Sequence, residues 1–333
     1  MKKNKRLNIT FSKFLAELKT VPVRYSSFIA IFIFLLFLPG QNYYQTLGLV
    51  KKESVLYELP FLMPTPNPYP LKTGTEEVPF LTAEAAILID PDSQVVVYEK
   101  NSGEKLLPAS TAKIMTAVVV LENYHENGVL TAWESISESS SDASLMGLKS
   151  GDRVTVKALL YGLLLNSGAD SAETLSQNFP GGKKAFLDEM NKTAKRIHLF
   201  DTHFVNESGL DENDQYTTVL DLARLASYAL KKPLFAKIVE TSSFVAYDIS
   251  GKKRYYLKNI NRLLNELNGT VGIKTGYTMR AGECLVNMVE RGGHRLLSVI
   301  LKSQDRFGET TALIEWGFRN LTFTAYDSLG KRP

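Results

Sequence analysis

The stretch from residue 108 to residue 121 constrains the fold more than any other part of the chain. It begins Pro-Ala-Ser-Thr-Ala-Lys and continues as an almost wholly apolar run. Ser110 and Lys113 stand three residues apart, so a helix that begins at or just before Ser110 places both side chains on one face. The apolar run predicts that this helix is central and buried, with its first turn opening on a cleft.

This pair has the chemistry of an activated nucleophile. A serine hydroxyl reacts poorly until a neighbouring base takes its proton. A lysine becomes such a base when burial or nearby positive charge lowers its pKa from about 10.4. A simpler interpretation stays open, in which Ser110 caps the helix and Lys113 is solvated.

Ser-x-x-Lys by itself is weak evidence, because the chain contains it four times. The other three copies begin at Ser102, Ser250 and Ser328, in polar stretches or in the C-terminal tail. Only the copy at Ser110 leads into a long apolar helix, and this context selects it.

The positive charge of the chain is concentrated at its N-terminus. The net charge is +4, and residues 1–24 carry seven basic side chains but a single acidic one. The rest of the chain is therefore close to neutral, which gives no support for nucleic-acid binding. The single cysteine, Cys284, excludes a disulfide within the chain. The four histidines follow no metal-binding spacing, so we expect no metal and no cofactor.

An uncharged apolar stretch follows the basic start. Residues 25–40 contain a solid run of isoleucine, leucine and phenylalanine, and a basic flank before such a run is typical of an export signal or a signal-anchor. The run is short for a membrane-spanning helix, which needs about 20 residues. No Ala-x-Ala cleavage site follows, which favours an uncleaved anchor with residues 1–24 in the cytoplasm.

The sequence then divides into a spacer and a folded domain. Prolines recur through residues 41–79, which predicts an extended tether between the membrane and the domain. The domain is expected at residues 80–322, on the outer face of the cytoplasmic membrane or exported, and residues 323–333 form a tail.

The order of the predicted elements indicates an α+β fold. Two short strands come first, a run of helices follows, and three strands and a helix close the domain, which predicts a five-stranded antiparallel sheet with a helical region inserted between its N- and C-terminal strands. The expected strands are residues 85–90, 95–99, 270–275, 283–290 and 295–302. Besides the helix that starts at Ser110, the expected helices are residues 156–165, 170–177 (with Asp170 as N-cap), 183–196, 218–230 and 310–318.

Two further motifs follow Ser110 in a meaningful order. Ser167-Gly168-Ala169 lies at a turn between two predicted helices, and Lys274-Thr275-Gly276 ends a predicted strand. Ser-x-x-Lys, a Ser-Asp-Asn-like element and Lys-Thr-Gly form the set found in penicillin-binding proteins and serine β-lactamases. A second Lys-Thr-Gly at residues 72–74 lies in the proline-rich stretch and shows how little the tripeptide means alone.

The chemistry of acyl transfer gives each part a role. Ser110 is the expected nucleophile, Lys113 its base, and the hydroxyl of Ser167 a proton path to the leaving amine. Lys274 and Thr275 would hold the free carboxylate of a peptide, and Gly276 would let the peptide backbone approach closely. The backbone N–H groups of Ser110 and Tyr277 are candidates for an oxyanion hole.

The chain resembles the D-alanyl-D-alanine carboxypeptidases, the low-molecular-weight penicillin-binding proteins of serine peptidase family S11. The resemblance covers about residues 83–321 and includes residues 108–116, 148–173, 204–221, 272–286 and 306–318. It implies a β-lactamase/penicillin-binding-protein-like fold, peptidoglycan stem peptides ending in D-Ala-D-Ala as substrates, and β-lactams as covalent inhibitors. It also implies that Arg306 helps to hold the terminal carboxylate, although a surface ion-pair role is equally compatible with the sequence.

The chain departs from the family pattern at two positions. Ala169 stands where the family usually has an asparagine that holds the substrate carbonyl and steadies the lysine, and Gln215 replaces a common histidine. Loss of one hydrogen bond to a charged group is worth about 1.5–3 kcal/mol, so activity could be reduced without being abolished. The alternative is therefore a weakly active or inactive membrane-tethered protein that binds peptidoglycan peptides. A β-lactamase is less favoured, because no glutamate motif that would activate a water follows Ser167.

Overall fold

The computed structural model describes residues 23–37, 69–133 and 144–324. The chain forms two units, Met1–Met63 and Pro64–Pro333, and each is described by itself.

The first unit contains helix α2, Val23–Phe37. This helix overlaps the predicted signal or anchor at residues 25–40 and exposes apolar side chains such as Phe28 and Leu36. No helix within the described ranges combines the length and the apolarity required to cross a membrane. Most of the predicted cytoplasmic segment, of the tether and of the tail lies outside the described residues.

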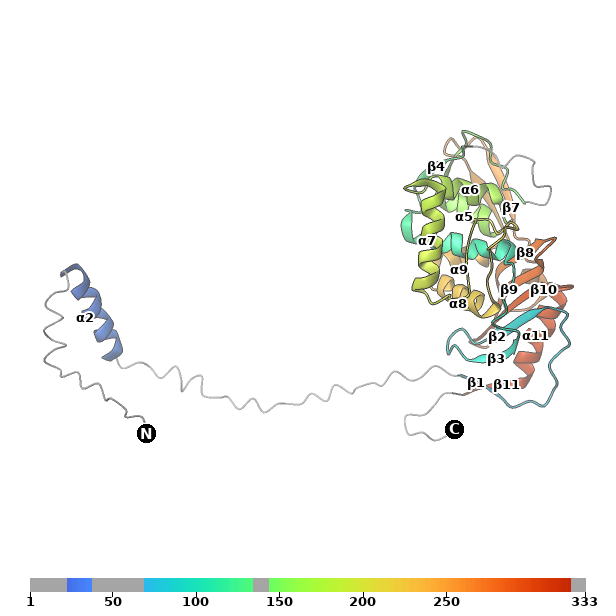
Figure 1. Ribbon diagram of the computed structural model, residues 1–333, viewed down its shortest axis with the longest axis horizontal. Coiled ribbons are helices and arrows are strands. Elements are labelled where there is room, and N and C mark those ends of the chain that lie inside the picture. The colour runs from blue at the N-terminus through green and yellow to red at the C-terminus, as the bar shows by residue number, and fades with distance from the viewer. Residues whose placement is uncertain (1–22, 38–68, 134–143, 325–333) are drawn as a thin grey trace. The chain divides into compact units, whose positions relative to one another are not determined.

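A five-stranded antiparallel sheet forms the base of the second unit, as the sequence predicted. The strand order is β3-β2-β10-β9-β8, so the N-terminal strands pair with the C-terminal hairpin through β2 and β10 (Figure 1). Every residue of β2 is buried, because this central strand packs on both of its faces. The five strands are β2 (Ala85–Ile89), β3 (Val96–Lys100), β8 (Thr270–Thr278), β9 (Gly282–Arg291) and β10 (His294–Ser303).

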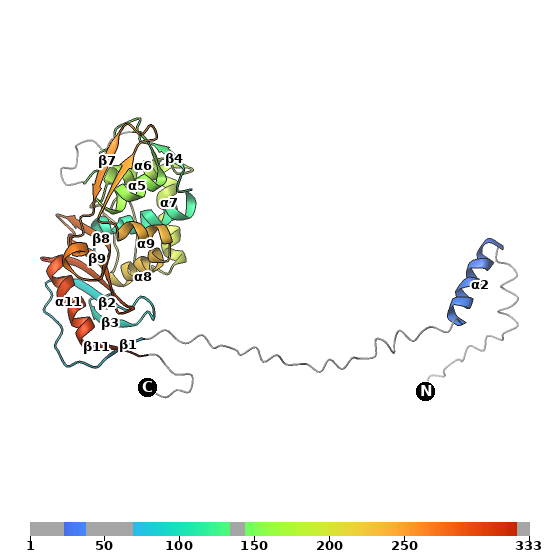
Figure 2. The same ribbon diagram turned by 180° about the vertical axis from the view of Figure 1, so that it is seen from behind.

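The alternation of side chains along the strands creates two hydrophobic cores. Ile87 and Ile89 point to a large core shared with the inserted helices, whereas Ala86 and Leu88 point to a smaller core beneath the last helix. Figures 1 and 2 show the sheet between α11 on one face and α8 on the other. The helices of the second unit are α4 (Lys113–Asn123), α5 (Val156–Leu164), α6 (Ala169–Gln177), α7 (Gly182–Arg196), α8 (Val219–Leu230), α9 (Pro233–Val239), α10 (Leu263–Glu266) and α11 (Arg306–Asn320), with a 3₁₀ turn, η1 (Ala109–Ala112), before α4.

Helix α4 is the buried central helix expected from the apolar run. Its residues from Lys113 to Val120 are all buried, and it packs against α5, α7 and α8. The chain enters α4 through η1, so Ser110 lies in a tight 3₁₀ turn rather than in the first α-helical turn. Residues three apart are eclipsed in a 3₁₀ turn, and Ser110 and Lys113 therefore still face each other.

The folded domain begins earlier than residue 80, inside the predicted tether. Strand β1 (Tyr69–Lys72) pairs with β11 (Leu321–Thr324), and the N–H groups of Thr73 and Gly74 donate to the carbonyl of Asn320. Prolines suggested a spacer, but Pro70 is accommodated because β1 lies at an edge and pairs on one side only. The predicted boundary at residue 80 is therefore wrong.

A hairpin beside the helical region was not predicted from the sequence. Strands β6 (Ser243–Tyr247) and β7 (Arg254–Lys258) pair with each other and pack on α5 through the stacked rings of Phe244 and Tyr161. A further short pair joins β4 (Val129–Thr131) to β5 (Arg153–Thr155).

Candidate active site

Ser110 and Lys113 lie within hydrogen-bond distance at the start of the central helix. Lys113 Nζ is 2.9 Å from Ser110 Oγ and donates a second hydrogen bond, 2.6 Å long, to the carbonyl oxygen of Ser208. Lys113 is only 2% exposed. Ala109, just before the serine, has a φ of 46°, an uncommon left-handed conformation for a residue with a side chain. The turn that presents Ser110 is therefore held in place by its surroundings.

Burial changes the acid–base properties of Lys113. Desolvation disfavours the ammonium form and lowers the pKa of Lys113 to about 7, while the negative charges of Glu207 and Asp170 oppose this shift. Within the described residues, Oε2 of the buried Glu207 has no hydrogen-bond partner, and its Oε1 pairs with Lys183 at 3.0 Å. Lys113 can therefore shed its proton near neutral pH, as a general base requires.

Ser167 and Ala169 occupy the turn between α5 and α6. Ser167 is buried with a φ of 63°, and Ala169 places only a methyl group on the pocket wall. The N-cap of α6 is Gly168, not Asp170 as predicted. The Asp170 carboxylate instead accepts hydrogen bonds from the N–H groups of residues 146, 147 and 148, at 2.8, 2.8 and 2.9 Å.

These bonds fix residues 144–148 as one wall of the pocket. The Ala169 N–H donates to the carbonyl of Ser144 at 2.8 Å, and Asn166 Nδ2 donates to the carbonyl of Leu145 at 2.7 Å. Ser144 thereby lines the pocket beside Ala169. The sequence did not indicate that Asp170 holds this wall, because its hydrogen-bond partners lie more than twenty residues earlier in the chain.

The Lys-Thr-Gly motif lies on β8, against the serine turn. A Cβ built on Gly276 would stand 2.9 Å from both the Cβ of Ala109 and the backbone N of Ser110, so only glycine fits without displacement. Thr275 and Tyr277 line the pocket. Arg306, at the start of α11, also lines it and donates from Nη1 to the carbonyl of Gly276 at 2.7 Å.

Lys274 lies behind the pocket rather than at its surface. It is 1% exposed, does not line the pocket, and donates to the carbonyl of Thr275 at 2.7 Å. Burial lowers the pKa of Lys274 well below its usual value, and the charges of Lys113 and Arg306 lower it further. The expectation that Lys274 grips a carboxylate directly is therefore not matched by its position in this structure.

One pocket of about 550 Å³ joins most of the predicted site residues. Its wall comes from η1, the α5–α6 turn, β8 and the start of α11. A loop at residues 209–212, which no sequence motif indicated, completes the wall. The predicted residues on this wall are Ser110, Lys113, Ser167, Thr275, Gly276, Tyr277 and Arg306.

The loop that accepts from Lys113 is tied down by two side-chain amides. Asn206 Oδ1 accepts from the Gly209 N–H at 2.7 Å, and both Asn206 Nδ2 and Gln215 Nε2 donate to the carbonyl of Leu210 at 2.9 Å. Gln215 Oε1 also accepts from the N–H groups of Val205 and Asn206, at 3.2 Å each. Gln215 therefore helps to position the loop that carries the Ser208 carbonyl.

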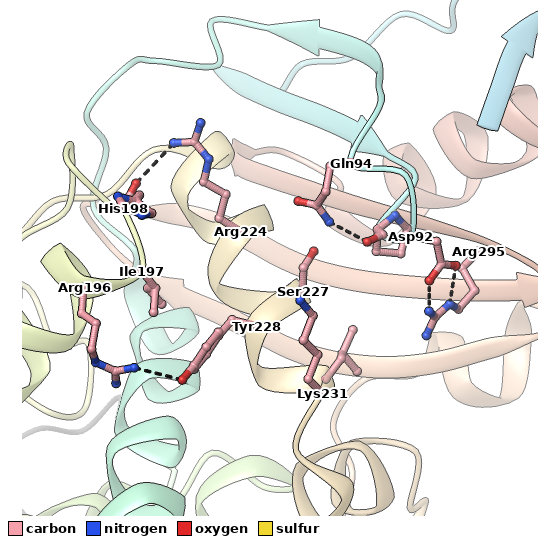
Figure 3. Close-up of a pocket in the computed structure, with 12 residues that line it drawn as sticks. Asp92, Gln94, Arg196, Ile197, His198, Arg224, Ser227, Tyr228, Lys231 and Arg295 are labelled. Carbon is pink, nitrogen blue, oxygen red and sulfur yellow. Dashed lines mark hydrogen bonds and ion pairs between the residues drawn. The ribbon is translucent and has the colours of Figure 1, made fainter. Parts of the chain in front are cut away.

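A larger depression, about 1030 Å³, lies at the opposite end of the sheet (Figure 3). Its arginines are already engaged: Arg196 bonds to Tyr228, and Arg295 pairs with Asp92. The C-terminal ends of α7 and α8 meet there, and cations are favourable at such ends without any ligand. This depression lacks a paired nucleophile and base, so the chemistry belongs to the smaller pocket.

Comparison with known proteins places this site in a family. The family model described as D-alanyl-D-alanine carboxypeptidase, peptidase S11, matches residues 72–305. The D-alanyl-D-alanine carboxypeptidase DacF of Bacillus subtilis is 33% identical over 71% of this chain, and that of Streptomyces sp. K15 is 32% identical over 72%. The crystal structure of the Streptomyces K15 DD-transpeptidase matches with a TM-score of 0.69 and 31% identity, covering 73% of this chain and all of that chain.

The extent of the match differs between relatives. The aligned region spans 62% of DacF from B. subtilis and 63% of DacC from Escherichia coli, but 88% of the Streptomyces protein. The family match contains the pocket residues from Ser110 to Met279 and ends one residue before Arg306. On this match, the chain belongs to the D-alanyl-D-alanine carboxypeptidase family of S11 serine peptidases.

Proposed function

We propose that this protein is a serine-type D-Ala-D-Ala carboxypeptidase that removes the terminal D-alanine from peptidoglycan stem peptides. The observation that carries the proposal is the 2.9 Å contact between Lys113 Nζ and Ser110 Oγ in a buried setting. The pKa of about 7 makes the neutral amine available at physiological pH.

Acylation begins when Lys113 takes the hydroxyl proton of Ser110. The freed oxygen attacks the carbonyl carbon of the scissile peptide bond, and the backbone N–H groups of Ser110 and Tyr277 hold the resulting oxyanion. One such donor is worth about 2.7–4 kcal/mol in the transition state. The C–N bond then breaks, the amine of D-alanine takes a proton by way of Ser167, and an ester on Ser110 remains.

Deacylation completes the cycle with water. A water molecule loses a proton to Lys113 and attacks the ester carbon, the ester C–O bond breaks, and Ser110 recovers its proton. The products are D-alanine and a shortened stem peptide. A β-lactam follows the first half of this path and remains attached to Ser110 as a slowly hydrolysed ester.

The terminal carboxylate of the peptide is held by Thr275 and Arg306. Both line the pocket, and a guanidinium can meet a carboxylate with two parallel hydrogen bonds. Lys274 supports this end of the pocket from behind, by bonding to the carbonyl of Thr275. Lys274 would therefore assist carboxylate binding by positioning Thr275, and not by contacting the carboxylate itself.

A second candidate function is a weakly active or inactive protein that binds peptidoglycan peptides. Ala169 favours it, because the pocket wall carries a methyl group where the family usually has an amide. Against it, Ser110, Lys113 and Ser167 all line one pocket, which a binding role does not require. We further propose that the domain acts on the outer face of the cytoplasmic membrane, held there by the N-terminal segment.

A covalent-labelling experiment separates the two functions. The full chain is incubated with a fluorescent penicillin and analysed by intact mass, in parallel with a D-alanine release assay on an acetylated D-Ala-D-Ala peptide. An enzyme gains one adduct, on Ser110, and releases D-alanine, whereas Ser110→Ala does neither. A wild-type chain that stays unlabelled and inactive would support the binding protein instead.

A further inference from the structure

A second groove, of about 550 Å³, lies between the β6–β7 hairpin and α10. The Tyr256 ring is 74% exposed on its wall, beside Val245 on the opposite strand and Leu264 of α10. These side chains give the groove an apolar face on which a flat ligand surface can pack.

The hairpin is a rigid platform for this groove. Its inner face is buried: the Phe244 ring stacks on Tyr161 at 3.7 Å between centroids, and the hydroxyl of Tyr255 donates to Asp152 at 2.9 Å. Because the inner side chains fix the hairpin, the outward position of Tyr256 follows from the strand alternation. The side chain of Tyr256 therefore points away from the buried face of the hairpin.

The lining chemistry selects the class of ligand. It combines an exposed aromatic ring with the hydroxyl of Ser243 and the amide of Asn265, and it contains one cation, Lys258, and no carboxylate. An aromatic face packs against the apolar C–H face of a sugar ring, while amide and hydroxyl groups meet the sugar hydroxyls. A charged peptide would find little charge complementarity here.

Two consecutive residues of the chain connect the groove to the catalytic pocket. Asn259 lines the groove, and the next residue, Ile260, lines the catalytic pocket. Ile260 is anchored by its N–H, which donates to the carbonyl of Leu165 just before the Ser167 turn. The stem peptide is covalently attached to a glycan strand, so a peptide that reacts at Ser110 brings the strand to the surface around the pocket.

We infer that the groove between β6–β7 and α10 binds the glycan strand to which the stem peptide is attached, with a sugar ring packed on Tyr256. This inference rests on the proposed function and refines it: the preferred substrate is a glycan-linked peptide rather than a free peptide. The glycan contributes to binding outside the reacting pocket.

The test compares two substrates and two variants of the full chain. Release of D-alanine is measured from a free pentapeptide and from soluble glycan chains that carry the same pentapeptide. Tyr256→Ala lowers kcat/KM on the glycan-linked substrate about three- to tenfold, the range expected for one lost aromatic packing contact, and acts selectively on that substrate. Tyr247→Ala is the matched control, since Tyr247 is 47% exposed on the same hairpin face but does not line the groove.

A binding measurement tests the glycan groove without requiring catalysis. Ser110→Ala is sedimented with insoluble glycan strands from which the peptides have been removed, alone and combined with Tyr256→Ala. Retention that weakens about three- to tenfold with Tyr256→Ala supports the inference even if no D-alanine is released by the wild type. Equal losses on both substrates, equal effects of Tyr247→Ala, or no retention on peptide-free strands would overturn it.

Discussion

The carbonyl oxygen of Ser208 accepts a 2.6 Å hydrogen bond from Lys113 Nζ, although the two residues are 95 positions apart in the chain. Lys113, the proposed catalytic base, is thereby anchored by two oxygens, one from Ser110 and one from a distant loop. A Cβ built on Gly209 would stand 1.9 Å from the Ala109 carbonyl, so this loop also packs directly against the serine turn. The geometry of the nucleophile therefore depends on how the 206–210 loop is held.

Replacing Gln215 should loosen that loop. Gln215→Ala removes the acceptor for the N–H groups of Val205 and Asn206 and one donor to Leu210, and unmet buried bonds cost about 1–3 kcal/mol. We expect the rate of penicillin acylation to fall about tenfold, measured by stopped-flow labelling. Asn213→Ala, an exposed neighbour, serves as control. An unchanged acylation rate in Gln215→Ala would show that the loop is fixed by other contacts.

The pH dependence of acylation should report the state of Lys113. The neutral amine is the active base, so the rate rises with pH through about 7 and levels off above it. Glu207 raises the pKa of Lys113, and Glu207→Gln should therefore move the midpoint to lower pH.

The control for this shift is an exposed carboxylate of the same region. Asp188→Asn breaks only a surface ion pair with Lys184 and should leave the midpoint in place. A midpoint near the ordinary lysine pKa, or one that Glu207→Gln does not move, would contradict the assignment of Lys113 as base.

Ala169 offers a gain-of-function test. Ala169→Asn restores an amide to the pocket wall, and a hydrogen bond to a charged or reacting group is worth about 1.5–3 kcal/mol. We expect kcat/KM for D-alanine release to increase about tenfold or more. Ala169→Leu has a similar volume without the amide and should not increase it. If both variants lose activity alike, the turn at Ser167 tolerates only a small side chain.

The strand that precedes residue 80 should contribute to stability. Deleting residues 69–79 removes the β1–β11 pairing and the bond from Trp316 Nε1 to the carbonyl of Glu76, which is 3.1 Å long. A loss of about 1–3 kcal/mol would lower the melting temperature by about 3–10 °C. Deleting residues 50–60, an equal length, should leave it unchanged in a calorimetric scan. Equal melting temperatures would mean that β1 pairs without stabilising the domain.

The sequence by itself determined the fold class and the family. Strand and helix periodicities are local properties, and the five strands of the sheet and the helices α4 to α8 and α11 match the predicted elements to within a few residues. The order of the three motifs indicated the family, and the comparisons with known proteins confirm it. The β6–β7 hairpin escaped prediction because Val245, Tyr247 and Tyr256 lie on its exposed face, and these apolar residues hide the polar/apolar alternation expected of a half-buried strand.

Only the tertiary structure decided how the site is assembled. Lys274 reads as a surface cation in sequence, yet it lies behind the pocket on the carbonyl of Thr275. Asp170 reads as a helix cap, yet it holds the opposite wall through the N–H groups of residues 146–148. Strand β1 pairs with residues near the C-terminus. Each of these depends on backbone groups or side chains that are distant in the chain and meet only after folding, so local sequence patterns do not reveal the partners.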